Sequence, residues 1–290
     1  MTLIDGKHIS EQIIGEIAHE VAALVRNGHR PPHLVAVLVG HDGASEGYVA
    51  AKMRACARCG FRSTTLRLET DITQRQLLDT VARLNADATV DGFIVQLPLP
   101  PHIDEQLVIE AIDYRKDVDG FHPVNVGRVA LGLPGFVAAT PQGIITLMER
   151  YGIATAGRRC VVVGRSNIVG KPVASLLMRK AQPGNCTVTI CHSATPHLEQ
   201  FTRQADILIT AVGHPGLITA DMVRPGVAIF DVGITRVPSA STPSGWHLLG
   251  DVDFDSVSRL CSFITPIPGG VGPMTIASLM QNTLKAYRNK

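Results

Sequence analysis

The sequence is poor in aromatic residues and has no long hydrophobic run. Only 4% of its 290 residues are Phe, Trp or Tyr, whereas 45% are hydrophobic, so aliphatic side chains must build the core. This composition excludes an intrinsically disordered chain. The apolar runs, such as residues 160–163, have the length of a strand and are far too short to span a bilayer. We therefore expect a globular protein without membrane association.

The sequence also lacks a strong charge of either sign. Its net charge of +2 provides no basic field for nucleic acid, and we expect no nucleic-acid partner. The first ten residues include Asp5, Lys7 and His8 and contain no apolar segment of the kind found in secretory signals. We therefore expect the protein to be cytoplasmic.

Clustered metal ligands are also missing. Cys56 and Cys59 have the spacing of a zinc or thioredoxin-like motif, but no second ligand pair stands at a suitable distance. We interpret them as two cysteines on an ordinary helix. Residues 250–255 resemble the start of a calcium loop, but Ser256 replaces the required glycine and Ser262 replaces the last ligand. The eleven histidines show no ligand spacing, so we expect no metal.

The first half of the chain alternates between strand and helix patterns. Residues 34–39 form a buried apolar run, and a helix is predicted from about Ser45, a candidate N-cap, to Gly60. Residues 73–76 form a capping box that opens another helix, and residues 92–97 predict a further strand. This βαβ pattern predicts a parallel sheet with helices on both faces.

The second half continues the alternation after a polar, glycine-rich stretch. We expect strands at 159–163, 187–191, 207–211 and 227–231, and helices at 140–151, 169–178 and 274–287. The fold class is therefore α/β with two domains. We expect one domain over residues 1–139, which the C-terminal helix 273–290 joins, and the other over residues 140–272.

A glycine turn follows the first strand of the second half. Gly164 permits a tight turn, and Gly170 lets the next helix approach the sheet, as in dinucleotide-binding folds. Ser166 stands where the middle glycine of that motif would be. Arg165 offers a guanidinium to a phosphate, and no Asp or Glu accompanies Ser193 at the end of the second strand, which favours NADP over NAD. The alternative is a solvated arginine and a turn serine.

Several ordered blocks of sequence carry a resemblance to a known family. The blocks are residues 48–52, 92–100, 116–120, 140–141, 163–170, 191–193 and 266–275. Through them the chain resembles the bifunctional methylenetetrahydrofolate dehydrogenase/cyclohydrolase family, often called FolD. No matched block lacks its functional residue.

The resemblance implies a fold and an activity. The fold is an N-terminal three-layer α/β catalytic domain and a Rossmann-like NADP-binding domain, with a cleft between them. The activity is oxidation of 5,10-methylenetetrahydrofolate to 5,10-methenyltetrahydrofolate with NADP, followed by hydrolysis to 10-formyltetrahydrofolate, in one-carbon metabolism and purine biosynthesis. The resemblance also implies a homodimer formed through the cofactor domain.

The resemblance assigns four catalytic residues. Lys52 is expected to relay protons during hydrolysis, and Tyr48 to pack on the folate ring system. Gln96 is expected to hydrogen-bond the amine of Lys52 and to set its orientation. The carboxylate of Asp119 is expected to accept hydrogen bonds from the amino-pyrimidine edge of the pterin, which offers two donors to two oxygens.

Further residues are assigned to binding. Ser45, Tyr48 and Lys52 lie at i, i+3 and i+7, so a helix presents them on one face. The expected substrate-binding residues are Ser45, Tyr48, Asp119, Pro268, Gly269 and Gly272. The expected cofactor-binding residues are Gly164, Arg165, Ser166, Gly170, Ser193 and Ile234.

Alternatives remain open at this stage. Lys52 could be a solvated lysine on an amphipathic helix, Gln96 could satisfy the proline-rich turn that follows it, and Asp119 could be a turn former. The whole chain could instead be another two-domain NADP-dependent oxidoreductase, similar to shikimate dehydrogenase, or a non-catalytic NADP-binding protein with a vestigial folate cleft. The sequence assigns no role to the loop 237–246.

Overall fold

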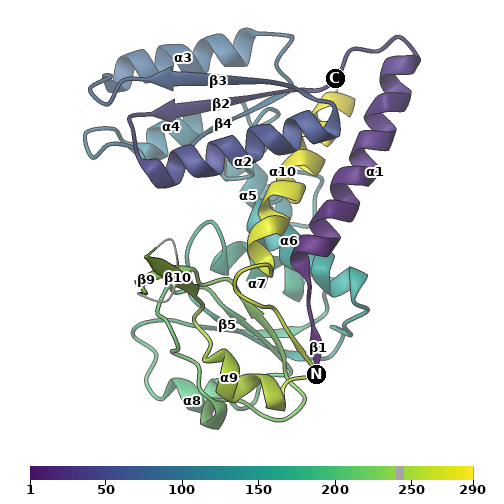
Figure 1. Cartoon of the computed structure of the whole chain (residues 1–290), viewed down its shortest axis with the longest axis vertical. Helices are drawn as coiled ribbons and strands as arrows, with labels where there is room; N and C mark the ends of the chain where they lie inside the picture. The colour runs from purple at the N-terminus through teal and green to yellow at the C-terminus, as the bar shows by residue number, and fades with distance from the viewer. Residues whose placement is uncertain (240–244, 290) are drawn as a thin grey trace. The chain divides into compact units, whose positions relative to one another are not determined.

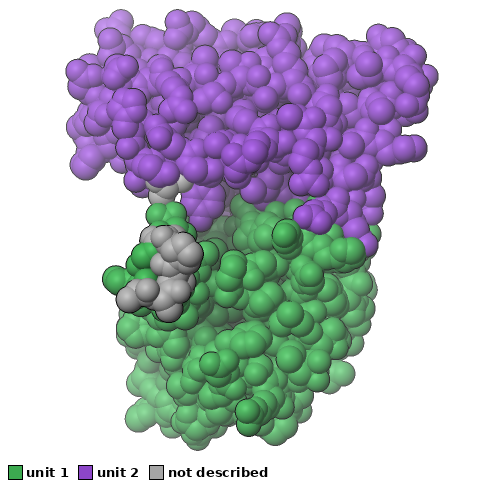
Figure 2. All heavy atoms as spheres, viewed as in Figure 1, with its two compact units in different colours: residues 1–10, 140–275 green, residues 11–139, 276–290 purple. Residues whose placement is uncertain are grey.

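A computed structural model describes residues 1–239 and 245–289 (Figure 1). Contacts divide the chain into two compact units, coloured separately in Figure 2. Unit 1 comprises Met1–Ser10 and Thr140–Thr275, and unit 2 comprises Glu11–Ala139 and Ile276–Lys290. None of the helices in the described ranges combines the length and apolar character needed to cross a membrane.

Unit 2 is built on a three-stranded parallel sheet. The strands β2 (His33–Val39), β3 (Arg62–Leu68) and β4 (Gly92–Val95) lie in the order β3-β2-β4. Every residue of β2 is buried, as expected for a central strand that is covered on both faces. The sequence expectation of a parallel sheet from residues 34–39 and 92–97 is confirmed.

Helices cover the two faces of this sheet (Figure 1). On one face, Val35 and Val37 share a core with Leu77 and Val81 of α3 (Gln74–Ala86) and with residues of α4 (Glu105–Ala111). The helix α2 (Gly43–Cys59) packs against β2 and β3. Because strand side chains alternate between faces, residues 34, 36 and 38 supply the other side of β2.

The start of α2 differs from the sequence expectation. The N-cap is Asp42, whose carboxylate accepts a hydrogen bond from the backbone N–H of Ser45 at 2.7 Å. Placing the cap at Ser45 was therefore wrong, because the earlier aspartate satisfies the same free amides. Gly60 ends the helix with a φ of 73°, and Thr73 opens α3 with the predicted capping box.

Two long helices contribute residues to both units. They are α1 (Gly6–Arg26) and α10 (Val271–Arg288). Within unit 2, the buried side-chain amide of Asn282 on α10 donates to the carbonyls of Val118 and Val137, both at 2.9 Å. A short helix α5 (Pro123–Ala130) completes the unit. The chain around residue 118 is thus fixed by the last helix.

Unit 1 contains a six-stranded parallel sheet. Its order is β1 (Thr2–Leu3), β11 (Phe263–Ile264), β8 (Ala228–Asp231), β7 (Ile207–Thr210), β5 (Arg159–Val163) and β6 (Thr187–Cys191). The four longer strands lie where the sequence predicts them. The two-residue strands β1 and β11 were not foreseen, and their pairing joins residues 1–10 to unit 1, whereas we had expected residues 1–139 to form one domain.

Smaller elements complete unit 1. They are α6 (Ala139–Arg150), α7 (Gly170–Met178), α8 (Leu198–Thr202), α9 (Phe254–Val257), two 3₁₀ turns (Ala220–Met222 and Ser258–Leu260) and the hairpin β9 (Thr235–Pro238) and β10 (Trp246–Leu249). The middle of the loop 237–246 lies outside the described residues.

Candidate functional site

The carboxyl edge of the unit 2 sheet contains a topological switch point. The chain leaves β2 towards β3 on one side and returns to β4 on the other. In open α/β sheets, ligands bind outside the carboxyl ends of the strands at such a point. Gln96 directly follows β4, and its backbone N–H donates to the carbonyl of Val37 at 2.9 Å. The side chain of Gln96 therefore starts from a fixed position at this edge.

Lys52 and Gln96 meet at the switch point. The ammonium of Lys52 donates to Oε1 of Gln96 at 3.1 Å, and only 9% of the lysine is exposed. Nε2 of Gln96 donates to the carbonyl of Leu97 at 2.7 Å, which fixes the orientation of the amide and turns its oxygen towards the amine. Lys52 is therefore not a solvated surface lysine.

Ser45 and Tyr48 lie on the same helix as Lys52. All three belong to α2, and their spacing places them on one side of it. Ser45 is buried, whereas 53% of Tyr48 is exposed. An exposed tyrosine beside a buried lysine provides a ring face on which a planar ligand can pack.

Asp119 lies in a loop that its neighbour Asp117 holds. The carboxylate of Asp117 accepts hydrogen bonds from the backbone N–H groups of Gly120, Phe121 and His122 and from the side chain of Asn125, at 2.8 to 3.2 Å. Gly120 has a φ of 73°, and a Cβ there would lie 2.6 Å from the backbone of residues 137 and 138. Asp117 is thus the turn former, and it leaves Asp119 free for another role.

The carboxylate of Asp119 is electrostatically coupled to Lys52. Burial raises the pKa of Asp119, the positive charge of Lys52 lowers it, and the negative charge of Asp117 raises it further. No side chain or backbone group within the described residues donates a hydrogen bond to this carboxylate. Its oxygens are therefore available to a ligand with paired donors.

Lys52, Gln96 and Asp119 form an amine–amide–carboxylate set. The amine of Lys52 can carry a proton, the amide of Gln96 holds the amine, and Asp119 can anchor a ligand by two hydrogen bonds. Such a set suits acid–base chemistry on a nitrogen-containing ring, and the structure brings it together from α2, the end of β4 and the loop after residue 116.

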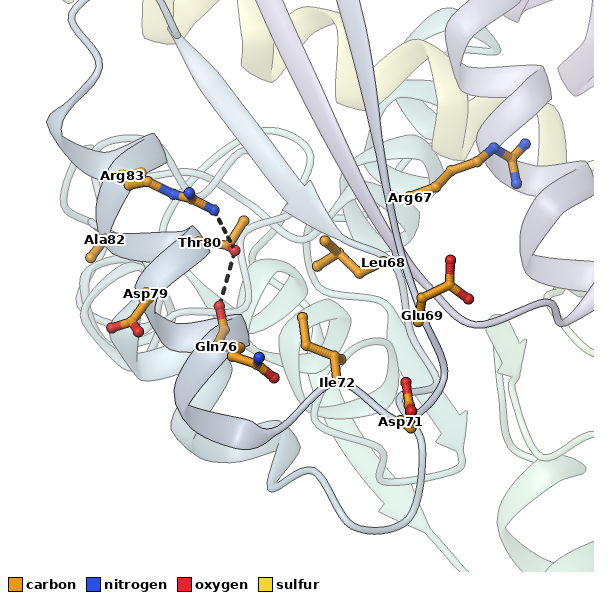
Figure 3. Close-up of a pocket in the computed structure, with 10 residues that line it drawn as sticks. All are labelled: Arg67, Leu68, Glu69, Asp71, Ile72, Gln76, Asp79, Thr80, Ala82 and Arg83. Atoms are coloured by element: carbon orange, nitrogen blue, oxygen red, sulfur yellow. Dashed lines mark hydrogen bonds between the residues drawn. The ribbon is translucent and has the colours of Figure 1, made fainter.

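Unit 2 also has a cavity away from these residues. It has a volume of about 950 Å³ and lies between the end of β3 and one side of α3 (Figure 3). Its lining mixes acids and bases, and Arg83 donates to Thr80 within it at 2.9 Å. None of the predicted site residues lines this cavity. We therefore locate the site by the chemistry of the residues at the switch point and not by the size of a cavity.

The glycine turn of unit 1 allows a close approach of backbone segments between β5 and α7. Gly164 has a φ of 122°, and a Cβ there would lie 2.5 Å from the carbonyl oxygen of Ala211. A Cβ on Gly170, the first residue of α7, would collide with the backbone of Gly164. The hydroxyl of Ser166 accepts from the N–H groups of Val169 and Gly170 at 3.1 and 3.3 Å. The turn therefore packs its backbone against Ala211 and the start of α7, which is the strand–glycine turn–helix arrangement of dinucleotide-binding folds.

Arg165 and Ser193 follow neighbouring strands at this edge. β5 and β6 pair with Val163 opposite Cys191, and the N–H of Gly164 donates to the carbonyl of Cys191 at 2.8 Å. Both Arg165 and Ser193 are exposed just beyond these residues. A guanidinium and a hydroxyl at adjacent strand ends fit a phosphate group. Ile234, also exposed, follows β8 by three residues.

The glycine-rich loop 266–272 leads from β11 into α10 and includes the first two residues of that helix. Gly269 has a φ of 106°, and its carbonyl accepts a hydrogen bond from the N–H of Lys7 at 2.9 Å. Pro268 and Gly272 are exposed. A Cβ added to Gly272 would lie 3.6 Å from Cδ1 of Ile234, so this loop and the predicted cofactor residue Ile234 are neighbours within unit 1.

Sequence reasoning missed a pair of buried aspartates in unit 1. Asp231 ends β8 and is 4% exposed, and Asp251 follows β10 and is fully buried. Asp231 accepts hydrogen bonds from the N–H groups of Gly233, Asp251 and Val252 and from the hydroxyl of Thr210, at 2.9 to 3.1 Å. Asp251 belongs to the segment that resembles a calcium loop, and its carboxylate binds backbone amides instead. The strand-end position of Asp231 was the available signal.

Asp231 gives the protein a pH-dependent stability. Burial raises its pKa from 3.8 to about 6, with the backbone N–H of Val252 opposing the shift and the negative charge of Asp251 adding to it. A raised pKa in the folded state means that folding binds a proton more tightly, so this contribution is full below pH about 4 and is lost as the pH rises through about 6. We expect the free energy of unfolding of unit 1 to fall by roughly 3 kcal/mol over that window from this group alone.

Chemical denaturation at pH 4, 5, 6 and 7 measures this effect, and NMR of carboxyl-labelled aspartates reports the titration of Asp231 directly. The Asp231→Asn variant identifies its signal. A carboxyl that titrates near pH 4 in the folded protein would contradict the prediction.

The fold and the two sites define a class of protein. A parallel sheet with a glycine turn at its carboxyl edge, in a chain whose other α/β unit carries a buried lysine held by a glutamine, is typical of an α/β enzyme of the dinucleotide-dependent kind. The family model described as the tetrahydrofolate dehydrogenase/cyclohydrolase catalytic domain matches residues 4–119, and the model for the NAD(P)-binding domain of the same family matches residues 138–290. The chain belongs to the tetrahydrofolate dehydrogenase/cyclohydrolase family.

Relatives and solved structures agree with this assignment. The chain is 63% identical to the bifunctional protein FolD of Bacteroides fragilis, over 99% of this chain and 98% of the relative. It is similar to the crystal structure of the bifunctional FolD enzyme from Campylobacter jejuni, with a TM-score of 0.94 and 46% identity over 100% and 99% of the two chains. The Trypanosoma brucei FolD structure, complexed with NADP cofactor and inhibitor, has a TM-score of 0.94 and 38% identity over 100% and 98%. Shikimate dehydrogenase from Aquifex aeolicus, at 12% identity and a TM-score of 0.51 over 89% and 92%, shares the fold alone.

The cysteines are structural in this fold. Cys56 and Cys59 lie on α2 as expected, and burial raises the pKa of each thiol to about 12, which keeps the thiolate form negligible. Within the described ranges, no three His, Cys, Asp or Glu side chains are grouped so that they could hold a metal ion.

Proposed function

We propose that this chain oxidises 5,10-methylenetetrahydrofolate to 5,10-methenyltetrahydrofolate with NADP and then hydrolyses the product to 10-formyltetrahydrofolate. The observation that carries the proposal is the buried Lys52, held by Gln96 at a sheet switch point, in a chain of the tetrahydrofolate dehydrogenase/cyclohydrolase family. The two reactions act on the same carbon of one substrate, so a single folate site serves both.

In the hydrolytic step, Lys52 transfers protons. Water adds to the methenyl carbon, and Lys52, as the neutral amine, takes one proton from this water and gives it to the ring nitrogen that leaves. The bond from the carbon to that nitrogen breaks as the carbonyl of the formyl group forms, and the second proton of the water is released to solvent. Gln96 accepts a hydrogen bond from the amine and is itself anchored to the carbonyl of Leu97, so the amine is held in one direction. Because the amine is already oriented, less conformational entropy has to be lost in the reaction than with a mobile lysine.

Other residues hold the folate. Asp119 accepts two hydrogen bonds from the amino-pyrimidine edge, which its unoccupied oxygens permit. Tyr48 packs its exposed ring on the pterin system, and Ser45 lies one turn before it on α2. We assign the backbone of Pro268, Gly269 and Gly272 to the folate as well.

Unit 1 holds the cofactor in this proposal. The turn Gly164–Ser166 and the first residue of α7, Gly170, bind the pyrophosphate, because they lie where a strand runs through a glycine turn into the N-terminus of a helix. Arg165 and Ser193 bind the 2′-phosphate, and Ile234 lies against the nicotinamide half. NADP, when bound, accepts the hydride from the methylene carbon, and the protein aligns the two carbons.

An absorbance assay tests the proposal. The purified chain is mixed with 5,10-methylenetetrahydrofolate and NADP, and then with NAD in place of NADP, and the reduced cofactor and the methenyl and formyl products are followed. We expect reduction with NADP and conversion of methenyl to formyl folate well above the spontaneous rate. Reduction driven by shikimate, or NADP binding without turnover of folate, would overturn it.

Arg165 is expected to set the preference for NADP over NAD. Replacing it by Ala removes charge-assisted hydrogen bonds to the 2′-phosphate, so the KM for NADP should rise roughly 10- to 100-fold. The KM for NAD should change little, because NAD lacks that phosphate. Arg158→Ala, another exposed arginine of unit 1, is the matched control. Equal effects on the two cofactors would contradict the assignment.

We also propose a cytoplasmic homodimer formed through unit 1. All six cysteines are free, as a reducing compartment requires. β6 stands at one end of the sheet order and carries the exposed Ile190, which gives a second copy an edge against which to pack.

Sedimentation velocity tests the subunit number, and Ile190→Lys is expected to shift the protein towards monomer.

A further inference from the structure

We propose that Asp231 and Asp251 are positioning residues for the cofactor, and that they act together by holding the segment 211–214 as one wall of the cofactor crevice. This rests on the proposed function, which supplies the dinucleotide. Neither side chain reaches the surface, since Asp231 is 4% exposed and Asp251 is fully buried. Both therefore act through the backbone that they hold.

The segment 211–214 lies at the switch point of the unit 1 sheet. From β5 the chain passes to β6 on one side and then to β7 on the other, so the crevice opens between the carboxyl ends of β5 and β7. Gly164 follows β5 and Ala211 follows β7. Because a Cβ on Gly164 would lie 2.5 Å from the oxygen of Ala211, the two segments approach each other backbone to backbone.

Asp251 holds this segment through both of its oxygens. Oδ2 accepts from the N–H of Val212 and Oδ1 from the N–H of His214, each at 2.8 Å. The side chains of residues 212 and 214 are exposed, and residue 213 is a glycine with a φ of 68°. Side-chain packing therefore contributes little to the position of the segment. The N–H of Ala211 donates to the carbonyl of Val163 at 2.8 Å and the hydroxyl of Thr235 donates to the carbonyl of Gly213 at 3.3 Å, while Asp251 holds two of the backbone N–H groups of the segment.

Asp231 in turn holds Asp251. It accepts from the backbone N–H of Asp251 at 3.1 Å and of Val252 at 2.9 Å, and from the hydroxyl of Thr210, the last residue of β7, at 3.1 Å. A Cβ on Gly233 would overlap the Asp251 carboxylate, and one on Gly250 would overlap that of Asp231. Glycine is therefore required at positions 233 and 250 for the two carboxylates to lie where they do.

The same pair reaches the other predicted binding segments. The N–H of Gly233 donates to Asp231 at 3.0 Å, one residue before Ile234, and the N–H of Asp231 donates to the hydroxyl of Thr265 at 2.8 Å, one residue before the loop 266–272. The ends of β7, β8 and β11 are thus joined by one buried cluster. If either carboxylate is displaced, we expect the backbone of residues 212, 214 and 233 to move first, because their N–H groups bond directly to Asp251 or Asp231.

The test uses Asp251→Asn in the full chain. An amide has one acceptor oxygen, so its NH₂ group would face either the N–H of Val212 or that of His214, and the segment would lose one attachment. We expect the Kd for NADP, measured by calorimetric titration, to rise roughly tenfold. Hydrolysis of 5,10-methenyltetrahydrofolate consumes no NADP and should stay within about twofold of the wild-type rate.

Two further variants keep the test decisive. Asp255→Asn removes an exposed carboxylate four residues after Asp251, and this variant should bind NADP as the wild type does. Thr210→Val removes one donor to Asp231, keeps both acids, and should raise the Kd for NADP several-fold; it serves if Asp251→Asn does not fold. Unchanged NADP binding in both Asp251→Asn and Thr210→Val, or equal loss of NADP binding and of hydrolysis, overturns the positioning role. A wild-type chain that binds NADP but turns over no folate overturns the proposed function instead, because the titration needs no turnover.

Discussion

Replacing Lys52 by Met is expected to abolish the hydrolytic step and to leave 5,10-methenyltetrahydrofolate to accumulate. Methionine fills the same buried space next to Gln96 but carries no proton. A positioned general acid–base group contributes on the order of 10²- to 10⁴-fold in rate, so the enzymatic conversion of methenyl to formyl folate should fall to near the spontaneous rate. The measurement is the decay of methenyl absorbance with the purified variant.

The oxidation step provides the internal comparison for this variant. It needs alignment of two carbons rather than proton transfer, so reduction of NADP should fall less than hydrolysis does. Lys180→Met, at an exposed lysine of unit 1, is the matched control and should retain both activities. A Lys52→Met enzyme that still hydrolyses methenyl folate well above the spontaneous rate would refute the assigned role.

Replacing Asp119 by Asn is expected to lower kcat/KM by roughly 100-fold for both reactions, because each needs the same bound pterin. The amide keeps the size of the carboxylate but offers one acceptor where the aspartate offers two. The loop should remain in place, since Asp117, not Asp119, binds its backbone amides. Steady-state kinetics of each reaction at a series of folate concentrations give the ratio.

Asp71→Asn, an exposed aspartate beside β3, serves as the control for Asp119 and should behave as the wild type. NADP binding by the Asp119→Asn variant should also be unchanged, because the predicted cofactor residues belong to unit 1. A variant that loses only one of the two activities would contradict a shared pterin anchor.

The local elements could be predicted because short-range forces determine them. The aliphatic run at 34–39 forms a strand buried on both faces, and Thr73 with Gln76 forms the expected capping box. Gly164 and Gly170 also follow from local reasoning, since a strand that runs into a glycine turn and a helix needs them for close backbone approach. The helical spacing of residues 45, 48 and 52 likewise placed them on α2.

Only the tertiary structure determines which residues far apart in the sequence become partners. The pairing of β1 with β11 assigns residues 1–10 to unit 1, and two-residue strands carry too little pattern to reveal it. The contact of Lys52 with Gln96 spans 44 residues, and only the family resemblance anticipated it.

The buried pair of Asp231 and Asp251 shows the same division. The sequence determines that one of them ends a strand, while their shared hydrogen bonds depend on where β7, β8 and the segment after β10 meet. Periodicity records which face of an element is buried. It does not record which distant backbone amide comes to lie beside a carboxylate, because the packing of the whole unit sets that distance.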